Sequence, residues 1–169
     1  MEKKTHQWTE QEAYERLAAQ CAQAELCQWD AERKMKRWNL SSEVMERIIS
    51  KLVKERFIDE ERFSLAFVKD KFRYNHWGKV RIEQELKLRH VAGRHISQAL
   101  EVIEGGESES ALREMIRKKR PSVKGKNKHE IRAKLIRFAL GKGFQMDEIV
   151  KVVGSMDDNK EEEMENEQW

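Results

Sequence analysis

An internal repeat constrains the fold of this chain more than any other feature of its sequence. Three segments align without a gap: AERKMKRWNLSSEVMERII from residue 31, IEQELKLRHVAGRHISQAL from residue 82 and LIRFALGKGFQMDEIVKVV from residue 135. The segments recur about every fifty residues, and apolar residues occupy matching places in all three. A repeat of this kind predicts supersecondary units that stack and share their apolar faces with their neighbours.

Each aligned segment predicts a helix, a residue with a left-handed backbone that ends it (the stop), a buried apolar residue directly after the stop (the apolar anchor), and a second helix. The stop falls at Asn39, His90 and Gly143, which are the residue types that most readily adopt a left-handed backbone. A further helix precedes each segment, near residues 10–25, 60–75 and 108–120. We therefore predict an all-α fold of three tandem three-helix repeats, forming an elongated array that can curve. The expected repeats cover residues 9–56, 57–105 and 106–154.

Helix-start signals support this division, because Ser, Thr, Asp and Asn side chains cap the first free N–H groups of a helix. Apolar residues between these signals recur at helical spacing, and the alternation typical of strands is nearly absent. The predicted helix starts lie at Thr9 with Glu12, Ser41 and Ser42 before Glu43, Asp59, Ser108, and Asn127 with Glu130.

Several function classes find no support in the sequence. Cys21 and Cys27 are six residues apart, a spacing that matches no metal or redox motif and favours reduced thiols. The histidines form no paired ligand motif, and neither a phosphate-binding loop nor a nucleophile motif occurs. We expect no metal, no cofactor and no enzymatic activity. Neither a membrane-length apolar run nor the apolar core of a signal peptide is found, which predicts a cytoplasmic protein.

The middle repeat carries a recognisable pattern. The stretch RFIDEERFSLAFVKDKFRYNHWGKVRIEQELKLRHV, residues 56–91, resembles the core signature of the RecX family, regulators of the RecA recombinase. The matching parts are residues 57–63, the corner of Gly78 with Arg81-Ile82, and the helix that ends at Val91. The stretch LIRFALGKGFQMDEI is similar to the third repeat of that family. The resemblance implies a protein that binds within the groove of the RecA–single-stranded DNA filament and inhibits filament growth, ATP hydrolysis and strand exchange.

The charge distribution agrees with a polyanionic partner. Residues 111–143 hold twelve basic and two acidic side chains, a net charge of +10, although the whole chain carries only +3. Such a patch favours contact with phosphates or with acidic protein surfaces. We expect residues 117–128 to form a loop. The candidate contacts with RecA or DNA are Arg73, Lys79, Arg81, Arg117, Lys118, Lys119, Arg120, Lys124, Lys126, Lys128, Arg132 and Arg137.

Other conspicuous residues have a structural interpretation. Arg62 lies in an acid-rich first helical turn and is expected to form a salt bridge or a cap. Phe63, Phe67, Phe138 and Phe144 are predicted core residues, because their spacing follows the apolar faces. The acidic segment 155–169 is interpreted as a disordered solvating tail, with shielding of the basic segment as a further hypothesis.

Two other functions remain open at this stage. The chain can be a stand-alone helical DNA-binding protein that places a recognition helix in the major groove, or a helical protein-interaction scaffold. The last helix of each repeat is acidic or apolar, whereas a recognition helix presents side chains such as Asn, Gln or Arg to base edges. The polarised charge argues against a scaffold without a nucleic-acid role. We expect a monomer that binds the RecA filament and single-stranded DNA.

Overall fold

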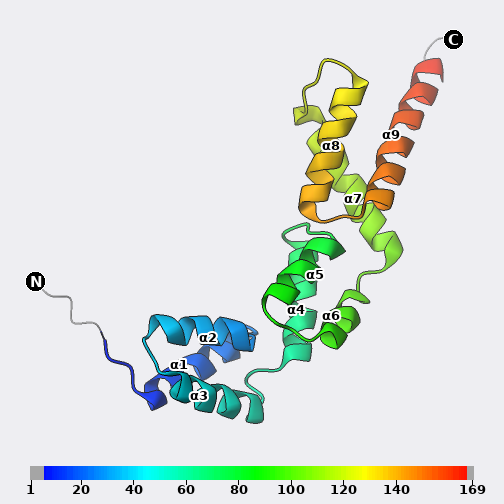
Figure 1. Ribbon diagram of the computed structural model, residues 1–169. Helices are drawn as coiled ribbons and strands as arrows, with labels where there is room; N and C mark the ends of the chain where they lie inside the picture. Colours follow the sequence, from blue (N-terminus) through cyan, green and yellow to red (C-terminus); the bar gives the residue numbers. More distant parts are fainter. Residues whose placement is uncertain (1–5, 167–169) are drawn as a thin grey trace, which may run out of the picture. The chain divides into compact units, whose positions relative to one another are not determined.

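The structure is a computed structural model that describes residues 6–166, with side chains described for residues 6–156. Every regular element in this range is helical, which confirms the all-α prediction (Figure 1). The elements are α1 (Glu10–Gln23), α2 (Gln28–Arg37), α3 (Ser42–Lys54), α4 (Glu60–Arg73), α5 (Lys79–Leu88), α6 (Gly93–Leu100), α7 (Gly105–Lys119), the 3-10 helix η1 (Arg120–Ser122), α8 (Lys128–Lys142) and α9 (Met146–Asn166).

These helices belong to two compact units. Unit 1 contains the described residues up to 67 together with 86–99, and unit 2 contains residues 68–85 together with those from 100 onward. The helices follow the predicted order of three per repeat, and the links between repeats lie at residues 55–59 and 101–104. The division into compact units, however, passes through α4 and α5 of the middle repeat rather than between repeats.

In unit 1 the core forms where α1, α2 and α3 meet. Each helix contributes two small or aliphatic side chains at helical spacing, and all of them are buried. The aromatic rings of Trp8 and Trp38 stack 4.3 Å apart beside this core. The buried core residues are Ala13, Leu17, Ala31, Met35, Ile48, Leu52 and Ile58.

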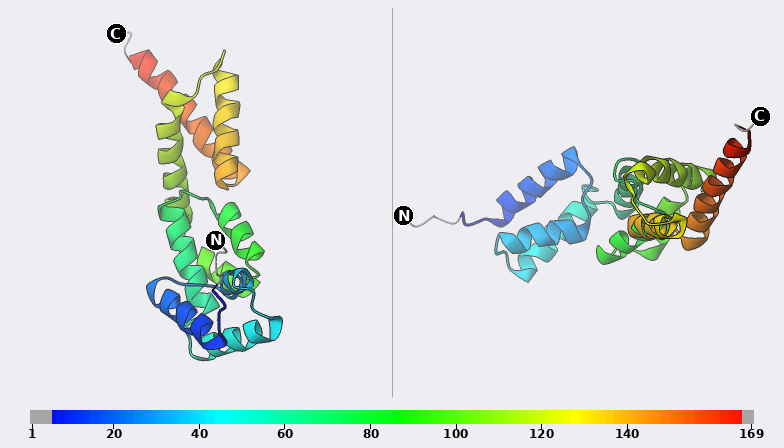
Figure 2. Two further views of the ribbon diagram at one scale, coloured as in Figure 1. Left: turned by 90° about the vertical axis from the view of Figure 1, so that its left-hand side faces the viewer. Right: turned by 90° about the horizontal axis from the view of Figure 1, so that it is seen from above.

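In unit 2 the last repeat forms a second core between α7, α8 and α9, which group together in the views of Figure 2. Phe144, directly after the α8 stop, is only 3% exposed, as predicted for the apolar anchor. The core residues are Leu112, Ile116, Leu135, Ala139, Phe144, Ile149, Val152 and Val153.

The predicted left-handed stops are confirmed. Asn39, His90 and Gly143 have φ angles of 57°, 58° and 90°. In each case the following residue donates its N–H to a carbonyl in the preceding helix, as from Val91 to Leu86 over 3.2 Å. Two more left-handed residues, Arg56 and His76, escaped prediction because neither lies in the aligned part of the repeat.

Most predicted helix starts are also confirmed. Thr9 and Glu12 form a reciprocal capping box, and the side chains of Ser41, Asp59 and Asn127 each accept a backbone N–H three residues on. The prediction for Ser108 is wrong. Helix α7 begins at Gly105, and Ser108 is a buried residue inside it whose hydroxyl donates to Glu148 over 2.5 Å.

The position of Ser108 shows that the first helices of the three repeats also correspond residue by residue, which the sequence alignment did not reveal. A small residue is buried in the first helix of each repeat, and an aliphatic residue follows four positions later on the same face. A small side chain there lets neighbouring helices approach closely. The matching pairs are Ala13 with Leu17, Ser64 with Val68 and Ser108 with Leu112.

Gly78 and Gly143 bring two backbone segments of unit 2 into direct contact. Gly78 N–H donates to the Lys142 carbonyl over 2.8 Å, and Val80 N–H donates to the Gly143 carbonyl over 3.0 Å. A Cβ on Gly78 would lie 2.3 Å from the Gly143 carbonyl oxygen, so no side chain fits. The link between α4 and α5 is therefore joined to the turn between α8 and α9, an arrangement that we call the glycine junction.

Arg62 has the structural role that was predicted. Its Nε donates to Glu25 over 2.5 Å, and its Nη2 donates to the carbonyl oxygens of Arg56 and Phe57 over 3.1 and 3.3 Å. Both carbonyls lie in the link that follows α3, at the left-handed Arg56 and at the residue after it. Arg62 thus holds the α3–α4 link against the end of α1.

The C-terminal acidic segment is only partly described. Helix α9 runs to Asn166 and so includes much of it, but the side chains from residue 157 onward lie outside the described residues. The disordered tail and its shielding of the basic segment stay predictions.

Candidate partner-binding surface

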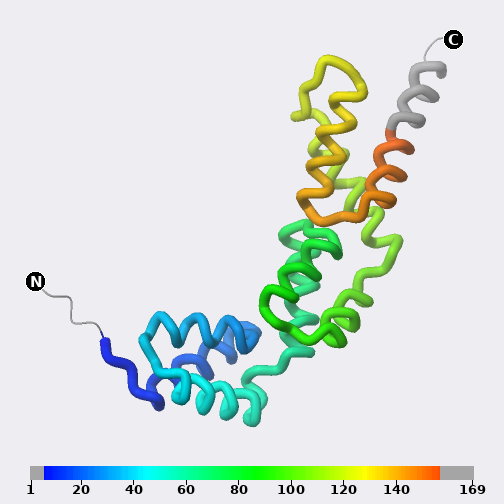
Figure 3. The backbone as a smooth tube through the Cα atoms, viewed as in Figure 1, coloured from blue at the N-terminus to red at the C-terminus, as the bar shows by residue number. Residues whose placement is uncertain are grey.

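The basic segment forms the hairpin of α7 and α8 in unit 2. Nine of the twelve predicted contact residues lie on this hairpin, between Arg117 and Arg137. The predicted loop is shorter than expected, because α7 continues to Lys119 and η1 follows directly (Figure 3). Only residues 123–127 connect η1 to α8. Most of the positive charge is therefore carried on helices, which fix its position better than a loop would.

Two of the predicted cations form ion pairs on α7. Glu114 accepts from the Arg117 Nε and Nη2 at 2.9 Å each, and lies 3.3 Å from the Lys118 Nζ. These bonds, that of Arg117 first, lower the pKa of Glu114 to about 2. All three side chains are exposed, so the pairs are weak and can open toward a stronger anion.

The short loop is fixed through its backbone. Lys134 Nζ donates to the Lys124 carbonyl over 2.7 Å, and the Lys126 N–H donates to the Glu130 carboxylate over 2.8 Å. The side chains of Lys124 and Lys126 themselves are exposed. The loop therefore carries two exposed lysine side chains on a backbone that is fixed to the hairpin.

The other basic residues of the hairpin differ in their surroundings. Lys119 Nζ lies 5.3 Å from the centre of the Phe138 ring, and Arg137 Nε donates to the Ala133 carbonyl over 3.3 Å. Arg120, Lys128 and Arg132 take part in interactions within the chain. The hairpin therefore positions these basic side chains through contacts within the chain.

The three candidate contact residues from the middle repeat, Arg73, Lys79 and Arg81, differ in exposure and in bonding. Arg81 is half-buried: its Nη1 donates to the Gly141 carbonyl over 3.1 Å and its guanidinium lies 4.1 Å from the Trp77 ring centre. This favours a structural role for Arg81 beside the glycine junction. Lys79 is half-buried at the start of α5, whereas Arg73 is exposed at the end of α4.

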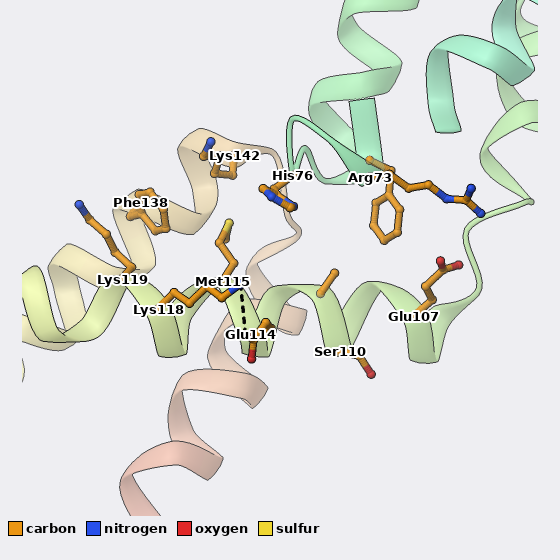
Figure 4. A pocket seen from close by; sticks show the side chains of 12 residues that line it. Arg73, His76, Glu107, Ser110, Glu114, Met115, Lys118, Lys119, Phe138 and Lys142 are labelled. Atoms are coloured by element: carbon orange, nitrogen blue, oxygen red, sulfur yellow. Dashed lines mark ion pairs between the residues drawn. The ribbon is translucent and has the colours of Figure 1, made fainter. Parts of the chain in front are cut away.

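Sequence reasoning missed a groove in unit 2, which Figure 4 shows from close by. It has a volume of about 670 Å³ and runs between the end of α4, the length of α7 and the last turns of α8. Its apolar lining comes from Phe72, Ala111, Met115 and Phe138. Its polar lining consists of Arg73, His76, Glu107, Ser110, Glu114, Lys118, Lys119 and Lys142.

The burial of Phe138 differs from the prediction. It was predicted as a core residue, but it is half-buried and faces the groove, as Figure 4 shows. Phe67 is likewise only half-buried, whereas Phe63 and Phe144 are buried as predicted. The spacing of apolar residues along α8 cannot distinguish a core residue from a residue that lines an adjacent groove. Both kinds of residue lie on the side of the helix that faces the rest of the unit.

The comparisons with known proteins agree with the repeat structure. Residues 59–100 match the family model described as RecX, second three-helix domain, and residues 107–153 match RecX, third three-helix domain. Together these two matches cover more than half of the chain. The chain belongs to the RecX family. The matched ranges correspond to α4–α6 and to α7–α9, so the family models treat the second and third repeats as successive domains.

Individual RecX relatives extend this result. A protein named Regulatory protein RecX from Oceanobacillus iheyensis is 33% identical over 119 residues, which are 70% of this chain and 43% of that protein. The match thus spans less than half the length of that relative. A crystal structure of regulatory protein RecX superposes with a TM-score of 0.76 at 18% identity, covering 86% of this chain and 71% of the other. RecX from Lactobacillus salivarius gives a TM-score of 0.73 at 16% identity, over 88% and 96%.

Two features are absent from the part of the chain that the structure describes. Its side chains form no group of three or more His, Cys, Asp or Glu with the geometry to hold a metal ion. Among the helices described, none combines the length and the apolar character that a membrane crossing requires.

Proposed function

We propose that the chain regulates the RecA recombinase by binding the RecA–single-stranded DNA filament and inhibiting its growth, its ATP hydrolysis and strand exchange. Membership of the RecX family carries this proposal, together with the relative that bears the name of a regulatory protein. A monomer is proposed as the active form, which light scattering of the purified chain would check.

The α7–α8 hairpin supports the proposal because it places many positive charges on two helices and the short loop between them. Cations that contact phosphates add affinity that depends on salt and not on sequence. A regulator of filaments formed on arbitrary single strands needs binding of that kind. The same cations can also meet acidic side chains of the recombinase, since both partners present anionic oxygens.

The direct experiment measures ATP hydrolysis and strand exchange by the cognate RecA on single-stranded DNA. We expect inhibition when the chain is present at fewer copies than RecA, because a blocked filament affects many subunits. An absence of inhibition at every salt concentration would refute the proposal. Sequence-specific binding to duplex DNA in a parallel titration would instead support a stand-alone DNA-binding protein.

A charge variant tests the hairpin within this function. Changing Lys118, Lys119 and Arg120 together to Ala removes three positive charges, while Glu114 keeps Arg117 as its partner. We expect weaker inhibition with an unchanged thermal unfolding curve. If all three residues contact phosphates of single-stranded DNA, the slope of log K against log salt becomes less steep by roughly 2.

The matched control removes the same charge elsewhere. Lys34, Lys36 and Arg37 lie in the last turn of α2 in unit 1, and replacing them by Ala also removes three positive charges. A loss of inhibition that is equal in both triple variants would show that only the total charge matters. Full inhibition by the hairpin variant would place the contact surface elsewhere.

A further inference from the structure

The groove between α4, α7 and α8 has an apolar lining, which binding of phosphates by the basic α7–α8 hairpin does not explain. We infer that it binds a segment of a partner protein in which one large apolar side chain is flanked by carboxylates. The inference deepens the proposed function, on which it rests only for the identity of that partner. The basic hairpin would then bind phosphates of the DNA, and the groove would bind a segment of the partner protein.

The size and lining of the groove fit a bulky side chain. Its volume of about 670 Å³ falls in the range of pockets that hold organic ligands, and it accommodates one large side chain with its adjoining backbone. The apolar lining comes from three helices, with Phe72 on α4, Ala111 and Met115 on α7 and Phe138 on α8. A Met at such a site adapts its shape to different occupants.

Ala111 is the residue that keeps the groove open. It lies on α7 between Ser110 and the buried Leu112, and it has the smallest side chain of the residues that line the groove. The helix positions one turn away on the lining face carry larger side chains, those of Glu107 and Met115. Filling position 111 with a large side chain would therefore occupy the space that an apolar anchor needs.

The charges at the rim indicate that the anchor is flanked by acids. Lys119 lies at the α7–α8 end, Arg73 at the end of α4 and Lys142 at the last turn of α8. Within the described residues, neither Arg73 nor Lys142 forms an ion pair. Of the two acids at the rim, Glu114 is already bonded to Arg117 and Lys118. The rim is thus net positive around an apolar floor.

The aromatic rings favour a peptide over a nucleobase as the occupant. Proteins that hold single strands stack bases on exposed aromatic faces. Phe72 is only 8% exposed, and the ring of Phe138 has the Lys119 ammonium 5.3 Å from its centre. A nearly buried ring and a ring with a cation beside it suit the packing of an aliphatic or aromatic side chain better than the stacking of a base.

The test uses the full chain and a defined probe. The probe is a fluorescein-labelled peptide with one central Phe and two Asp and two Glu on each side of it, and its partner peptide has Ser in place of Phe. Fluorescence anisotropy measures binding of each peptide to the chain. We expect the Phe peptide to bind at least about tenfold more tightly than the Ser peptide, since a buried Phe side chain is worth that much.

Three variants locate the binding. Ala111→Trp fills the groove without changing charge, and Ala133→Trp adds the same bulk at an exposed position of α8 outside the groove. Arg73→Gln with Lys142→Gln lowers the rim charge and leaves the floor intact, so it keeps the test valid if Ala111→Trp fails to fold. We expect peptide affinity to fall about tenfold or more in the Ala111 variant and in the rim variant, and to stay unchanged in the Ala133 variant.

Other results would overturn the inference. Equal affinity for the Phe and Ser peptides, or equal binding by the Ala111 and Ala133 variants, would show that only surface charge attracts the probe. If Ala111→Trp weakened binding of a twenty-nucleotide oligothymidine and left peptide binding unchanged, the groove would be a nucleic-acid site.

The same variants separate this inference from the proposed function. If Ala111→Trp loses inhibition of RecA ATP hydrolysis while Ala133→Trp retains it, the groove holds the segment of RecA. If both inhibit like the unchanged chain, the regulatory function stands and the groove has no part in it. If the unchanged chain does not inhibit RecA but its groove binds the peptide, the proposed function fails and the partner is another protein.

Discussion

The substitution Gly78→Ala tests how the second and third repeats are held together in unit 2. The added Cβ would lie 2.3 Å from the Gly143 oxygen, 2.4 Å from its carbonyl carbon and 2.5 Å from the Phe144 nitrogen. All three atoms belong to the backbone, so no side-chain rotation relieves the overlap. Gly78 does not have a left-handed φ, and the cost of the substitution is therefore steric.

The expected loss of stability follows from what must move. Separating the two segments by about 1 Å strains packing by roughly 1–3 kcal/mol. It also weakens the hydrogen bonds from Gly78 N–H to Lys142 and from Val80 N–H to Gly143, each worth about 0.5–1.5 kcal/mol. We expect a total of about 2–6 kcal/mol, which lowers the melting temperature of a chain of this size by roughly 4–24 °C.

Thermal and urea unfolding followed by circular dichroism would measure this loss, and hydrogen exchange of the Gly78 and Val80 amides would localise it. The matched control is Gly141→Ala, two residues before Gly143 in the same turn region. A Cβ at Gly141 meets nothing within 4 Å, so Ala should stabilise α8 by up to about 1 kcal/mol. Unfolding of Gly78→Ala within about 0.5 kcal/mol of the unchanged chain would refute the role given to the junction.

Three further predictions concern single side chains. Arg62→Met should lower the free energy of unfolding by about 1–2 kcal/mol through loss of the Glu25 pair and two carbonyl bonds; a double-mutant cycle with Glu25→Gln giving no coupling would contradict this. The Glu114 carboxyl should titrate near pH 2 by NMR, so the stability from its pairs is complete above its ordinary pKa of 4.5 and is lost as the pH falls toward 2; a midpoint near 4.5 would show that the pairs are absent in solution. Because burial raises the pKa of Cys27 to about 12, iodoacetamide at pH 8 should alkylate the half-buried Cys21 first and Cys27 only after unfolding, as mass spectrometry of the folded chain would show.

The helix order and the repeat stops were predictable from local sequence. Thr9 and Asn127 cap helices through bonds only three residues long, and the left-handed angles at Asn39 and His90 reflect the preferences of those residue types. Ser108 was assigned wrongly because a Ser shortly after two glycines resembles the cap at the start of a helix. Only the burial of that position, opposite Glu148, shows that the helix starts earlier.

The contacts between distant segments were not predictable in the same way. The partner of Gly78 is the backbone of Gly143, and a backbone contact leaves no side-chain pattern in the sequence. Arg81 was predicted as a contact residue from its basic side chain, yet its partners are a backbone carbonyl and an aromatic ring. The groove was missed because three helices contribute to it, and Ala111 taken alone is an unremarkable helix residue.

The glycine junction has a consequence for how members of the family can vary in length. Its two hydrogen bonds pair consecutive carbonyls, those of Lys142 and Gly143, with N–H groups two residues apart at Gly78 and Val80. One residue inserted or deleted in either turn would displace these N–H groups from their carbonyl acceptors by the length of one peptide unit. Insertions and deletions should therefore be confined to places such as the η1–α8 loop, while the two turns keep a constant residue count even where nearly every side chain around them has been replaced.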